Sequence, residues 1–219
     1  MRLLALDTAM EACSVALWHG DKVAVARRQA MARGHAEALM PMVATVMAEA
    51  GIDYGDLDAF AVTRGPGTFT GLRIGLAAAR GLALAAARPL IGLTTLEVLA
   101  AAVPEDRRGH GVMAAIDARR GEIYGQVFAP DLSPLGEPAA RGAEAWGGEI
   151  SGGPLRVVGT AAQQMTDLLG AGAEAIPGDG CPDAAVAAAL AARRPLPGMG
   201  VPVAPLYLRP PDARLPGGR

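Results

Sequence analysis

The chain has 219 residues, about half of them apolar, and a formal net charge of −2. This length and composition suit one compact fold of two lobes or two small domains, and they exclude an intrinsically disordered chain. The small net charge supplies no global positive field, so any contact with RNA would have to be local or made through a partner. The two cysteines, Cys13 and Cys181, are far apart and lack C-x-x-C spacing, which argues against a disulfide framework and a zinc site.

The apolar segments are too short for export or for a membrane span. Asp7 follows a run of only four apolar residues, fewer than the roughly 7–15 of a secretory signal. Arg73, Arg80 and Arg88 interrupt the most apolar helical region, so no run reaches the ~18–20 uncharged residues that cross a bilayer. We therefore expect a soluble, cytoplasmic protein that does not associate with membranes.

Three short strand-like runs open the chain, namely Arg2–Thr8, Cys13–Trp18 and Lys22–Gln29. They are joined by short turns, which predicts a three-stranded antiparallel meander. Asp7 is then expected at the carboxyl end of the first strand, and Ser14 is expected at the start of the second.

A helical pattern follows the meander. Apolar residues recur at helical spacing from His35 to Ala50, and Gly51 is a natural helix stop. Pro41 is expected to distort this helix or to lie in its first turn. The rest of the first half is predicted as a buried strand, a helix, a strand and a helix: Asp56–Gly65, Thr70–Ala87, Pro89–Leu93 and Thr94–Val103.

The second half resembles a degenerate copy of the first. Val112–Phe128 again reads as strand, aspartate, turn and strand, with Asp117 placed much as Asp7 is. Two helices are predicted further on, at Thr160–Leu169 and Asp183–Arg193. The charged segment Pro104–Gly111 is the expected hinge between the two halves.

These patterns divide the chain into three parts. Residues 1–103 are predicted as an N-terminal lobe and residues 104–208 as a smaller C-terminal lobe. The tail, residues 209–219, is rich in proline and glycine, which prevent both ladder and helix, so we expect it to be disordered.

The first hairpin is a candidate nucleotide site. Strand, aspartate, turn and strand is the arrangement by which actin-like ATPases and sugar kinases present an acid and small hydroxyl residues to phosphates and Mg²⁺. Asp7, Thr8 and Ser14 would face one cleft in that interpretation. The alternative is that Asp7 and Thr8 only form hydrogen bonds within the turn, as these residue types do at strand ends. The spacing leaves both open.

The glycine-rich turn Gly65–Gly71 also has two interpretations. Thr68 or Thr70 is a candidate N-cap for the helix that follows, and a helix N-terminus can hold an anion. However, no lysine follows, so the P-loop pattern is rejected, and the match to G-x-G-x-x-G is only partial. The turn therefore either binds a phosphate or is purely structural.

Small residues recur every fourth position along the next helix. Glycine weakens a helix by up to ~1 kcal/mol relative to alanine, so close packing must offset that cost. This small-residue ridge either packs against the protein's own sheet or helix, or it forms an interface with another chain. The methionines Met40, Met42 and Met47 favour the second possibility, because thioethers suit adaptable contacts. The ridge consists of Gly71, Gly75, Ala79, Ala83 and Ala87.

No catalytic or metal-binding motif emerges. The histidines His19, His35 and His110 lack H-x-x-x-H or H-E-x-x-H spacing, and no G-x-S-x-G occurs. We therefore predict no metal site and no catalytic residue.

Several segments together resemble the bacterial TsaB (YeaZ) family, in order and at the right spacing. They are "LALDTAMEACSVAL" (Leu4–Leu17), "HAEALMPMV" (His35–Val43), "AVTRGPGTFTGLRIGLAAARGLA" (Ala61–Ala83), "PLIGLTTLEVLA" (Pro89–Ala100) and "PLYLR" (Pro205–Arg209). The resemblance implies an α/β, two-lobed actin-like (ASKHA, ribonuclease H-like) fold with a degenerate second lobe. It also implies a role with TsaD and TsaE in making N6-threonylcarbamoyladenosine at position 37 of tRNAs that read codons beginning with A.

The resemblance further implies that the subunit is not itself catalytic. TsaD, the catalytic paralogue, carries a metal-binding H-x-x-x-H where this chain has Thr95 and Leu99. No tightly bound cofactor is expected, although ATP or ADP would bind weakly at the interface of the complex. The alternative function is an ATP-dependent phosphotransferase or ATPase that uses Asp7, Thr8 and Ser14, which the leading hypothesis treats as a vestigial site.

The same resemblance predicts the partners. In the family, the helices that correspond to His35–Ala50 and Thr70–Ala87 form a bundle with the same helices of TsaD, and isolated members pair with themselves through this surface. Contact with tRNA is then expected only through the complex. The predicted interface residues are His35, Leu39, Met42, Val43, Val46, Met47, Gly71, Leu72, Gly75, Leu76, Ala79 and Ala83.

Overall fold

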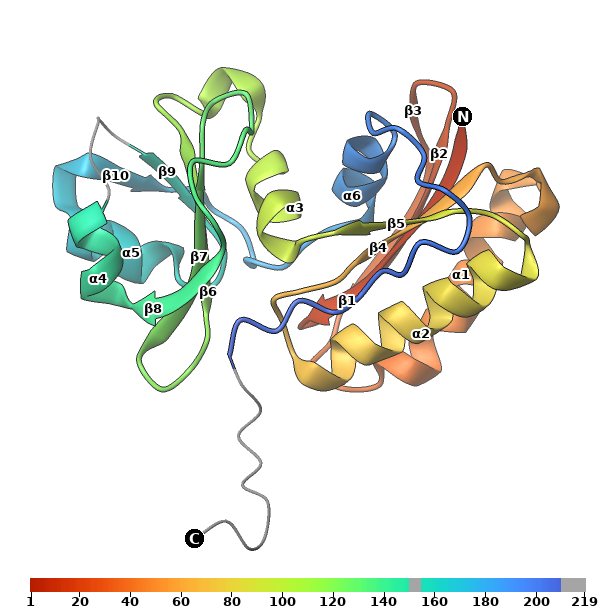
Figure 1. Ribbon diagram of the computed structural model, residues 1–219, viewed down its shortest axis with the longest axis horizontal. Coiled ribbons are helices and arrows are strands. Elements are labelled where there is room, and N and C mark those ends of the chain that lie inside the picture. The colour runs from red at the N-terminus through yellow and green to blue at the C-terminus, as the bar shows by residue number, and fades with distance from the viewer. Residues whose placement is uncertain (150–154, 210–219) are drawn as a thin grey trace, which may run out of the picture.

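A computed structural model of the protein describes residues 1–149 and 155–209, which form two α/β lobes side by side (Figure 1). Each lobe is built on a five-stranded mixed sheet. None of the helices in these two ranges combines the length and the apolar character needed to cross a bilayer.

The first sheet contains the predicted meander. Strands β3, β2 and β1 pair antiparallel, and β4 and β5 continue the sheet parallel to β1. Asp7 is directly opposite Ser14 in the ladder, and an irregularity follows between Asp7 and Met10. The strands are β1 (Arg2–Met10), β2 (Ala12–His19), β3 (Lys22–Ala30), β4 (Ala59–Thr63) and β5 (Leu90–Leu93).

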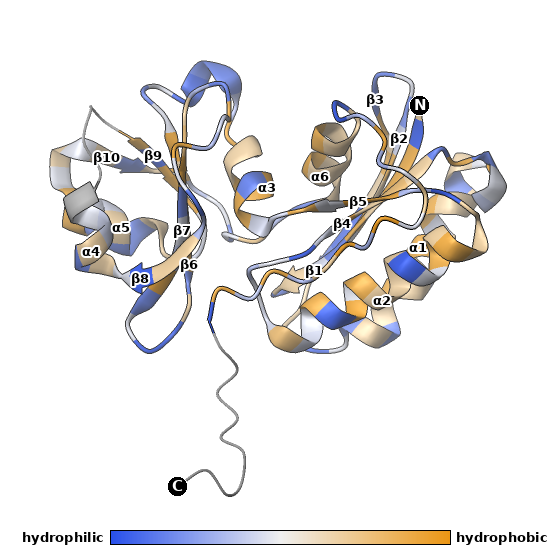
Figure 2. Ribbon diagram, viewed as in Figure 1, coloured by the Kyte–Doolittle hydropathy of each residue, from blue (hydrophilic) through white to orange (hydrophobic). Residues whose placement is uncertain are grey.

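Helices cover both faces of this sheet. Because side chains alternate along a strand, Leu4 and Leu6 of β1 pack toward α1 and α2, whereas Leu3 and Ala5 pack toward α6. α6 is hydrophobic on all sides (Figure 2), as expected for a helix of alanine, valine and leucine packed against a sheet. The helices of this region are α1 (His35–Ala50), α2 (Phe69–Ala85), α3 (Thr95–Ala101) and α6 (Ala184–Ala191).

The predicted helix limits hold to within two residues, and two local predictions are resolved. Thr68, not Thr70, is the N-cap of α2, and its hydroxyl accepts a hydrogen bond from the Gly71 amide at 3.2 Å. Pro41 lies beyond the first turn of α1, which continues through it to Ala50. The C-cap is Gly51 in the left-handed conformation, as the pattern predicted.

The second sheet repeats the first. Its strand order is β10-β9-β6-β7-β8, in which β6 takes the central place of β1 and β7 forms the hairpin partner. The prediction of a degenerate copy is therefore confirmed, with shorter strands than in the first sheet. The elements are β6 (Val112–Asp117), β7 (Glu122–Phe128), β8 (Ala139–Gly142), β9 (Leu155–Val158), β10 (Ala173–Ala175), α4 (Ala143–Glu149) and α5 (Ala162–Leu169). Single 3-10 turns occur at Tyr54–Asp56, Glu105–Arg107 and Gly170–Gly172.

The chain returns to the first lobe after its second sheet. α6 belongs to the 104–208 segment, yet it packs on the first sheet, and the Ala184 amide donates to the Ser14 hydroxyl at 2.9 Å. The boundary at residue 103 stays a prediction. Of the predicted tail, only Arg209 is described, and it is hydrogen-bonded to Ala118; the expected disorder of residues 210–219 lies outside the described residues.

Candidate functional site

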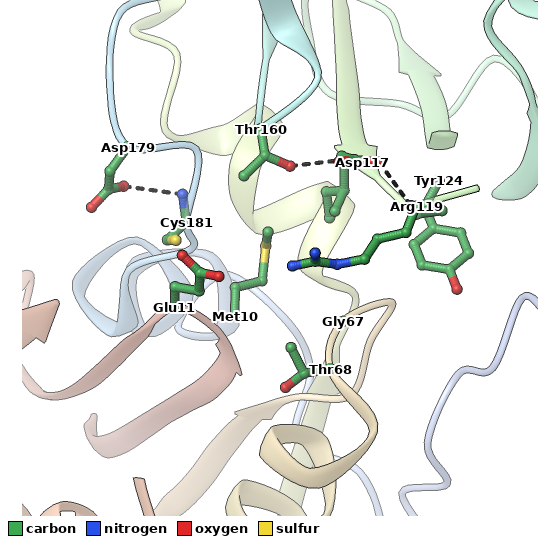
Figure 3. Close-up of a pocket in the computed structure, with 12 residues that line it drawn as sticks. Met10, Glu11, Gly67, Thr68, Asp117, Arg119, Tyr124, Thr160, Asp179 and Cys181 are labelled. Carbon is green, nitrogen blue, oxygen red and sulfur yellow. Dashed lines mark hydrogen bonds between the residues drawn. The ribbon is translucent and has the colours of Figure 1, made fainter. Parts of the chain in front are cut away.

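A cavity of about 410 Å³ lies between the lobes, where the first hairpin turn of each sheet meets the other (Figure 3). Met10 and Glu11 come from the β1–β2 turn, and Asp117 and Arg119 come from the β6–β7 turn. The duplicated hairpins thus face each other across the cavity. This is the place at which a two-lobed protein can hold a small molecule between its halves.

The β6–β7 turn is held by hydrogen bonds to Asp117. The Asp117 carboxylate accepts a hydrogen bond from the Arg119 amide at 2.7 Å, and the Asp117 amide donates a hydrogen bond to the Thr160 hydroxyl at 3.0 Å. Arg119 and Arg120 both adopt positive φ, 62° and 57°, which directs the chain sharply back into β7. As a result, the Arg119 guanidinium extends into the cavity toward Met10 and Glu11 (Figure 3).

The opposite wall carries Asp179 and Cys181. Burial opposes ionisation of Asp179, but its hydrogen bond and ion pair with Arg28 outweigh burial and lower its pKa. Burial, followed by the charge of Asp179, raises the pKa of the Cys181 thiol to about 11. Cys181 is therefore protonated at neutral pH and is not an activated nucleophile.

Among the described residues, three carboxylates line the cavity, those of Glu11, Asp117 and Asp179, and one cation, Arg119, lines it with them; Asp179 is paired with Arg28 behind the wall. Like charge opposes the approach of a polyphosphate unless a cation neutralises it. The walls are therefore poorly suited to a nucleoside triphosphate alone.

Asp7 is buried in β1, three residues before the strand ends at Met10, and does not line this cavity. One carboxylate oxygen accepts hydrogen bonds from the Thr63 hydroxyl and, at 3.3 Å, from the Ala9 amide. The other, Oδ2, has no hydrogen-bond partner among the described residues. Burial raises the pKa of Asp7 to about 7, and the charge of Asp183 adds to this while the hydrogen bonds from Thr63 and Ala9 oppose it.

The other two predicted nucleotide ligands are also buried and internally bonded. The Thr8 hydroxyl donates to the Gly71 carbonyl at 2.7 Å, and the Ser14 hydroxyl accepts from the Ala184 amide. Neither residue lines the cavity. Asp7, Thr8 and Ser14 are thus close together but closed off by the protein's own α2 and α6, and their role as a vestigial nucleotide site stays a prediction.

The small-residue ridge explains this closure. A Cβ on Gly71 would lie well under 3.0 Å from the Thr8 carbonyl, and one on Gly75 would lie 2.6 Å from the Thr8 hydroxyl oxygen. Glycine at these two positions allows α2 to lie directly against the end of β1. Of the two interpretations of the ridge, the structure therefore shows packing against the protein's own sheet.

The predicted interface residues do not lie on the surface. Eleven of the twelve are buried, and only Met42 is partly exposed. His35, for example, is 8 % exposed, and its Nε2 lies 2.9 Å from the Met10 carbonyl oxygen. The reason is that the apolar and small faces of α1 and α2 are the faces that bury against the sheet. An interface through these two helices stays a prediction, and its contacts must come from their exposed residues, which include Ala36, Met40, Ala44, Ala48, Arg73, Ala77, Gly81 and Leu84.

The two positions at which the resemblance to TsaD implied metal ligands are occupied by Thr95 and Leu99. Thr95 and Leu99 are both buried on α3, and Leu99 packs in an apolar cluster with Leu96 and Val103. Among residues 1–149 and 155–209, no three histidine, cysteine, aspartate or glutamate side chains are grouped so as to hold a metal ion.

Sequence reasoning missed most of the cavity lining, although Gly67 and Thr68 belong to the glycine-rich turn for which phosphate binding was one of two interpretations. The sequence repeats the first hairpin around Asp117, and the turn that follows contains Arg119, so this repeat is a signal that points to Arg119. Tyr124 and Asp179 carry no local signal, because they reach the cavity only through the packing of the two lobes.

Two lobes with the same five-strand order, meeting at a cavity, define a two-lobed actin-like α/β protein. The family model for TsaD, tRNA N6-adenosine threonylcarbamoyltransferase, matches residues 25–137. The TsaB protein of Escherichia coli is 45 % identical over 131 residues, which cover 60 % of this chain and 56 % of that protein. The TsaB of Haemophilus influenzae is 42 % identical over 125 residues, or 57 % of this chain and 52 % of that protein. The chain therefore spans about half the length of the curated relatives it matches.

A solved structure extends the match to nearly the whole chain. The crystal structure of a Pseudomonas aeruginosa protein with similarity to peptidase YeaZ superposes with a TM-score of 0.81 and 33 % identity, covering 95 % of this chain and 99 % of that one. YeaZ from the same organism superposes with a TM-score of 0.75 and 32 % identity, covering 87 % and 90 %. The chain belongs to the TsaB (YeaZ) family.

Proposed function

We propose that this protein is a noncatalytic scaffold subunit of tRNA threonylcarbamoyladenosine biosynthesis. In this role it acts with TsaD and TsaE in the transfer of a threonylcarbamoyl group to N6 of adenosine 37, in tRNAs that read codons beginning with A. The observation that carries the proposal is the 45 % identity to a protein named as a tRNA threonylcarbamoyladenosine biosynthesis protein.

Two features of the structure support the noncatalytic part of the proposal. By the resemblance, Thr95 and Leu99 take the positions of the TsaD metal ligands, and neither residue is a type that usually binds a catalytic metal ion. Asp7, the acid that an actin-like ATPase would use, is buried and bonded to Thr63 and Ala9. The chemistry is then left to TsaD.

The partner surface we propose is the exposed side of α1 and α2, which lie side by side along one edge of the first lobe (Figure 1). Small exposed residues such as Ala44, Ala77 and Gly81 permit the close approach of another pair of helices. TsaD is the partner in the complex, a second copy occupies the surface when TsaD is absent, and tRNA is reached through the complex. The complex acts in the cytoplasm, and any ATP or ADP binds weakly at its interface.

Light scattering coupled to size-exclusion chromatography tests the scaffold proposal. The chain is run alone and then mixed with TsaD from the same source. A one-to-one complex is expected, and tRNA modification in a reconstituted system should require both proteins and TsaE. Full modification activity of TsaD and TsaE without this chain would contradict the proposal.

The inter-lobe cavity favours one other function, an ATP-dependent phosphotransferase or ATPase. Titration calorimetry with Mg²⁺–ATP separates the two. Binding by the isolated chain at micromolar strength or better would favour the ATPase, whereas the scaffold predicts little or no binding. The buried and internally hydrogen-bonded position of Asp7 favours the scaffold.

A further inference from the structure

Two exposed aromatic residues from distant parts of the chain stack on the surface of the first lobe. Phe69, at the start of α2, and Tyr207, near the end of the described chain, have ring centroids 5.6 Å apart and planes inclined by 29°. Phe69 is 52 % exposed and Tyr207 is 44 % exposed. Only about 4 % of this chain is aromatic, so such a pair in contact with water is a conspicuous use of scarce residues.

Arg73 joins the pair. Its guanidinium carbon lies 3.6 Å from the centre of the Phe69 ring, and its Nε donates to the Tyr207 hydroxyl at 3.3 Å. Both contacts hold the guanidinium in place, so less conformational entropy is lost when it forms a further hydrogen bond. No carboxylate among the described residues forms an ion pair with Arg73.

The C-terminal segment fixes Tyr207 from both sides. The Arg80 side chain donates to the Val203 carbonyl, and the Leu206 amide donates to the Arg64 carbonyl at 2.7 Å. Past Tyr207, the Arg209 guanidinium donates to the Ala118 carbonyl of the second lobe at 3.0 Å. This segment therefore runs beside α2 to the other lobe (Figure 1), and Tyr207 is a preformed part of the surface.

The cluster lies at one end of the exposed side of α2. Phe69, Arg73, Ala77 and Gly81 are four residues apart and all exposed, so they share one stripe of the helix. Aromatic and arginine side chains are the types enriched at the energetic centres of protein interfaces. The small residues beyond them leave room for a partner's helix.

The charges of the two exposed helices differ. α2 carries Arg73 and Arg80 and no acidic residue, whereas α1 carries Glu37 and Glu49 and no lysine or arginine. The Arg80 guanidinium donates to the Val203 carbonyl, whereas Arg73 lies against the two exposed rings, so Arg73 is the cation on α2 that a partner would meet together with them. The complementary surface is thus a helix that presents a carboxylate.

We infer that Phe69, Arg73 and Tyr207 form the anchor of the partner interface. The partner packs a helix against them, and an aspartate or glutamate of that helix forms an ion pair with Arg73. This inference rests on the proposed function, in which the partner is TsaD. It adds that the C-terminal segment, through Tyr207, completes a contact surface that α1 and α2 alone do not provide.

The test measures the dissociation constant of the complex with TsaD from the same source, by calorimetry on the full chain. Arg73→Glu and Phe69→Ser should each weaken binding at least about tenfold, more than the loss caused by truncating most interface residues. Tyr207→Ser should weaken it severalfold. Arg73→Gln should keep part of the affinity and should reduce its dependence on salt, because the charge pair is lost.

Matched controls change the same residue types elsewhere on the surface. Arg193→Glu reverses an exposed arginine, and Leu135→Ser removes an apolar side chain that is 64 % exposed; both should leave binding within about twofold. Thermal melting of every variant checks that the fold is retained. Because all three anchor residues are exposed, their variants are expected to fold.

The outcomes separate this inference from the function on which it rests. If the unaltered chain does not bind TsaD, the proposed function fails. If the unaltered chain binds and Arg73→Glu and Phe69→Ser bind equally well, the anchor is wrong while the function stands. Loss of binding to a tRNA transcript by Phe69→Ser, with binding to TsaD unchanged, would also overturn the anchor and assign these rings to base stacking.

Discussion

Thr8 and Gly71 are in direct contact, although 63 residues separate them in the sequence. The Thr8 hydroxyl donates to the Gly71 carbonyl at 2.7 Å, and a side chain on residue 71 would collide with the Thr8 carbonyl. This contact sets the position of α2 on β1. It also closes the end of β1, where an actin-like ATPase would expose its acid.

The first prediction compares two glycines of α2. Gly71→Ala should destabilise the protein by roughly 2–4 kcal/mol, because the new Cβ meets backbone atoms that cannot move aside without shifting β1. Gly81→Ala is the matched control: a Cβ there meets nothing within 4 Å, so alanine should stabilise the helix by up to ~1 kcal/mol. Denaturant unfolding measures both. Equal effects of the two changes would contradict the packing described for α2.

The second prediction distinguishes the buried and exposed sides of α2. Ala77→Glu should leave the unfolding free energy within about 0.5 kcal/mol of the original and should abolish pairing with TsaD, because Ala77 is exposed at the centre of the proposed surface. Ala79→Leu should destabilise the fold by roughly 1–3 kcal/mol, since Ala79 is fully buried.

Light scattering measures pairing with TsaD, and denaturant unfolding measures the free energy of unfolding. Ala171→Glu, at an exposed position of the second lobe, serves as the control for an added charge and should change neither. Normal pairing by Ala77→Glu would exclude this side of α2 from the interface.

The third prediction concerns the pH dependence of stability. The pKa of Asp7 is about 7 in the folded protein and 3.8 as the model value, so the folded state binds more protons than the unfolded state between these values. The contribution of Asp7 to stability therefore falls as the pH rises from about 4 to 7, by up to the order of 4 kcal/mol. Above pH 7 the buried carboxylate is charged, so the full cost of burying that charge lowers the free energy of unfolding.

Asp7→Asn should remove this dependence. The measurement is the unfolding free energy of both proteins at pH 5 and pH 8. On going from pH 5 to pH 8, the variant should become more stable relative to the original protein. The slope is the readout, because the asparagine amide changes the hydrogen bonds with Thr63 at every pH. Parallel pH profiles for the two proteins would show that Asp7 is ionised throughout.

The fourth prediction concerns the thiols. Burial raises the pKa of both Cys13 and Cys181 to about 11, with the charge of Asp7 adding to burial at Cys13 and that of Asp179 adding to it at Cys181. Alkylation by iodoacetamide at pH 7.5 should thus be at least about tenfold slower in the folded protein than in the denatured one, as mass spectrometry can follow. Rapid labelling of Cys181 in the folded state would indicate a thiolate in the cavity.

The sequence by itself determined the elements and their repetition. Alternation and helical spacing predicted the meander and the two long helices almost to the residue, because these periods follow from local backbone geometry. The second strand–aspartate–turn–strand unit at Asp117 predicted the second sheet for the same reason. Motifs along the chain also identified the family, and the two threonines Thr68 and Thr70 were the alternative caps predicted for α2, of which Thr68 is the cap.

Only the tertiary structure decided which surface each element presents. The spacing of Gly71 and Gly75 showed that something must approach α2 closely, but Thr8, which does so, is distant in sequence. The predicted interface residues were consequently those that pack inward. Phe69 and Tyr207 meet only because the chain returns from the second lobe to the first, and the inter-lobe cavity has the same origin. Periodicity reports that a face is apolar or small, whereas the partner of that face depends on how distant segments pack together.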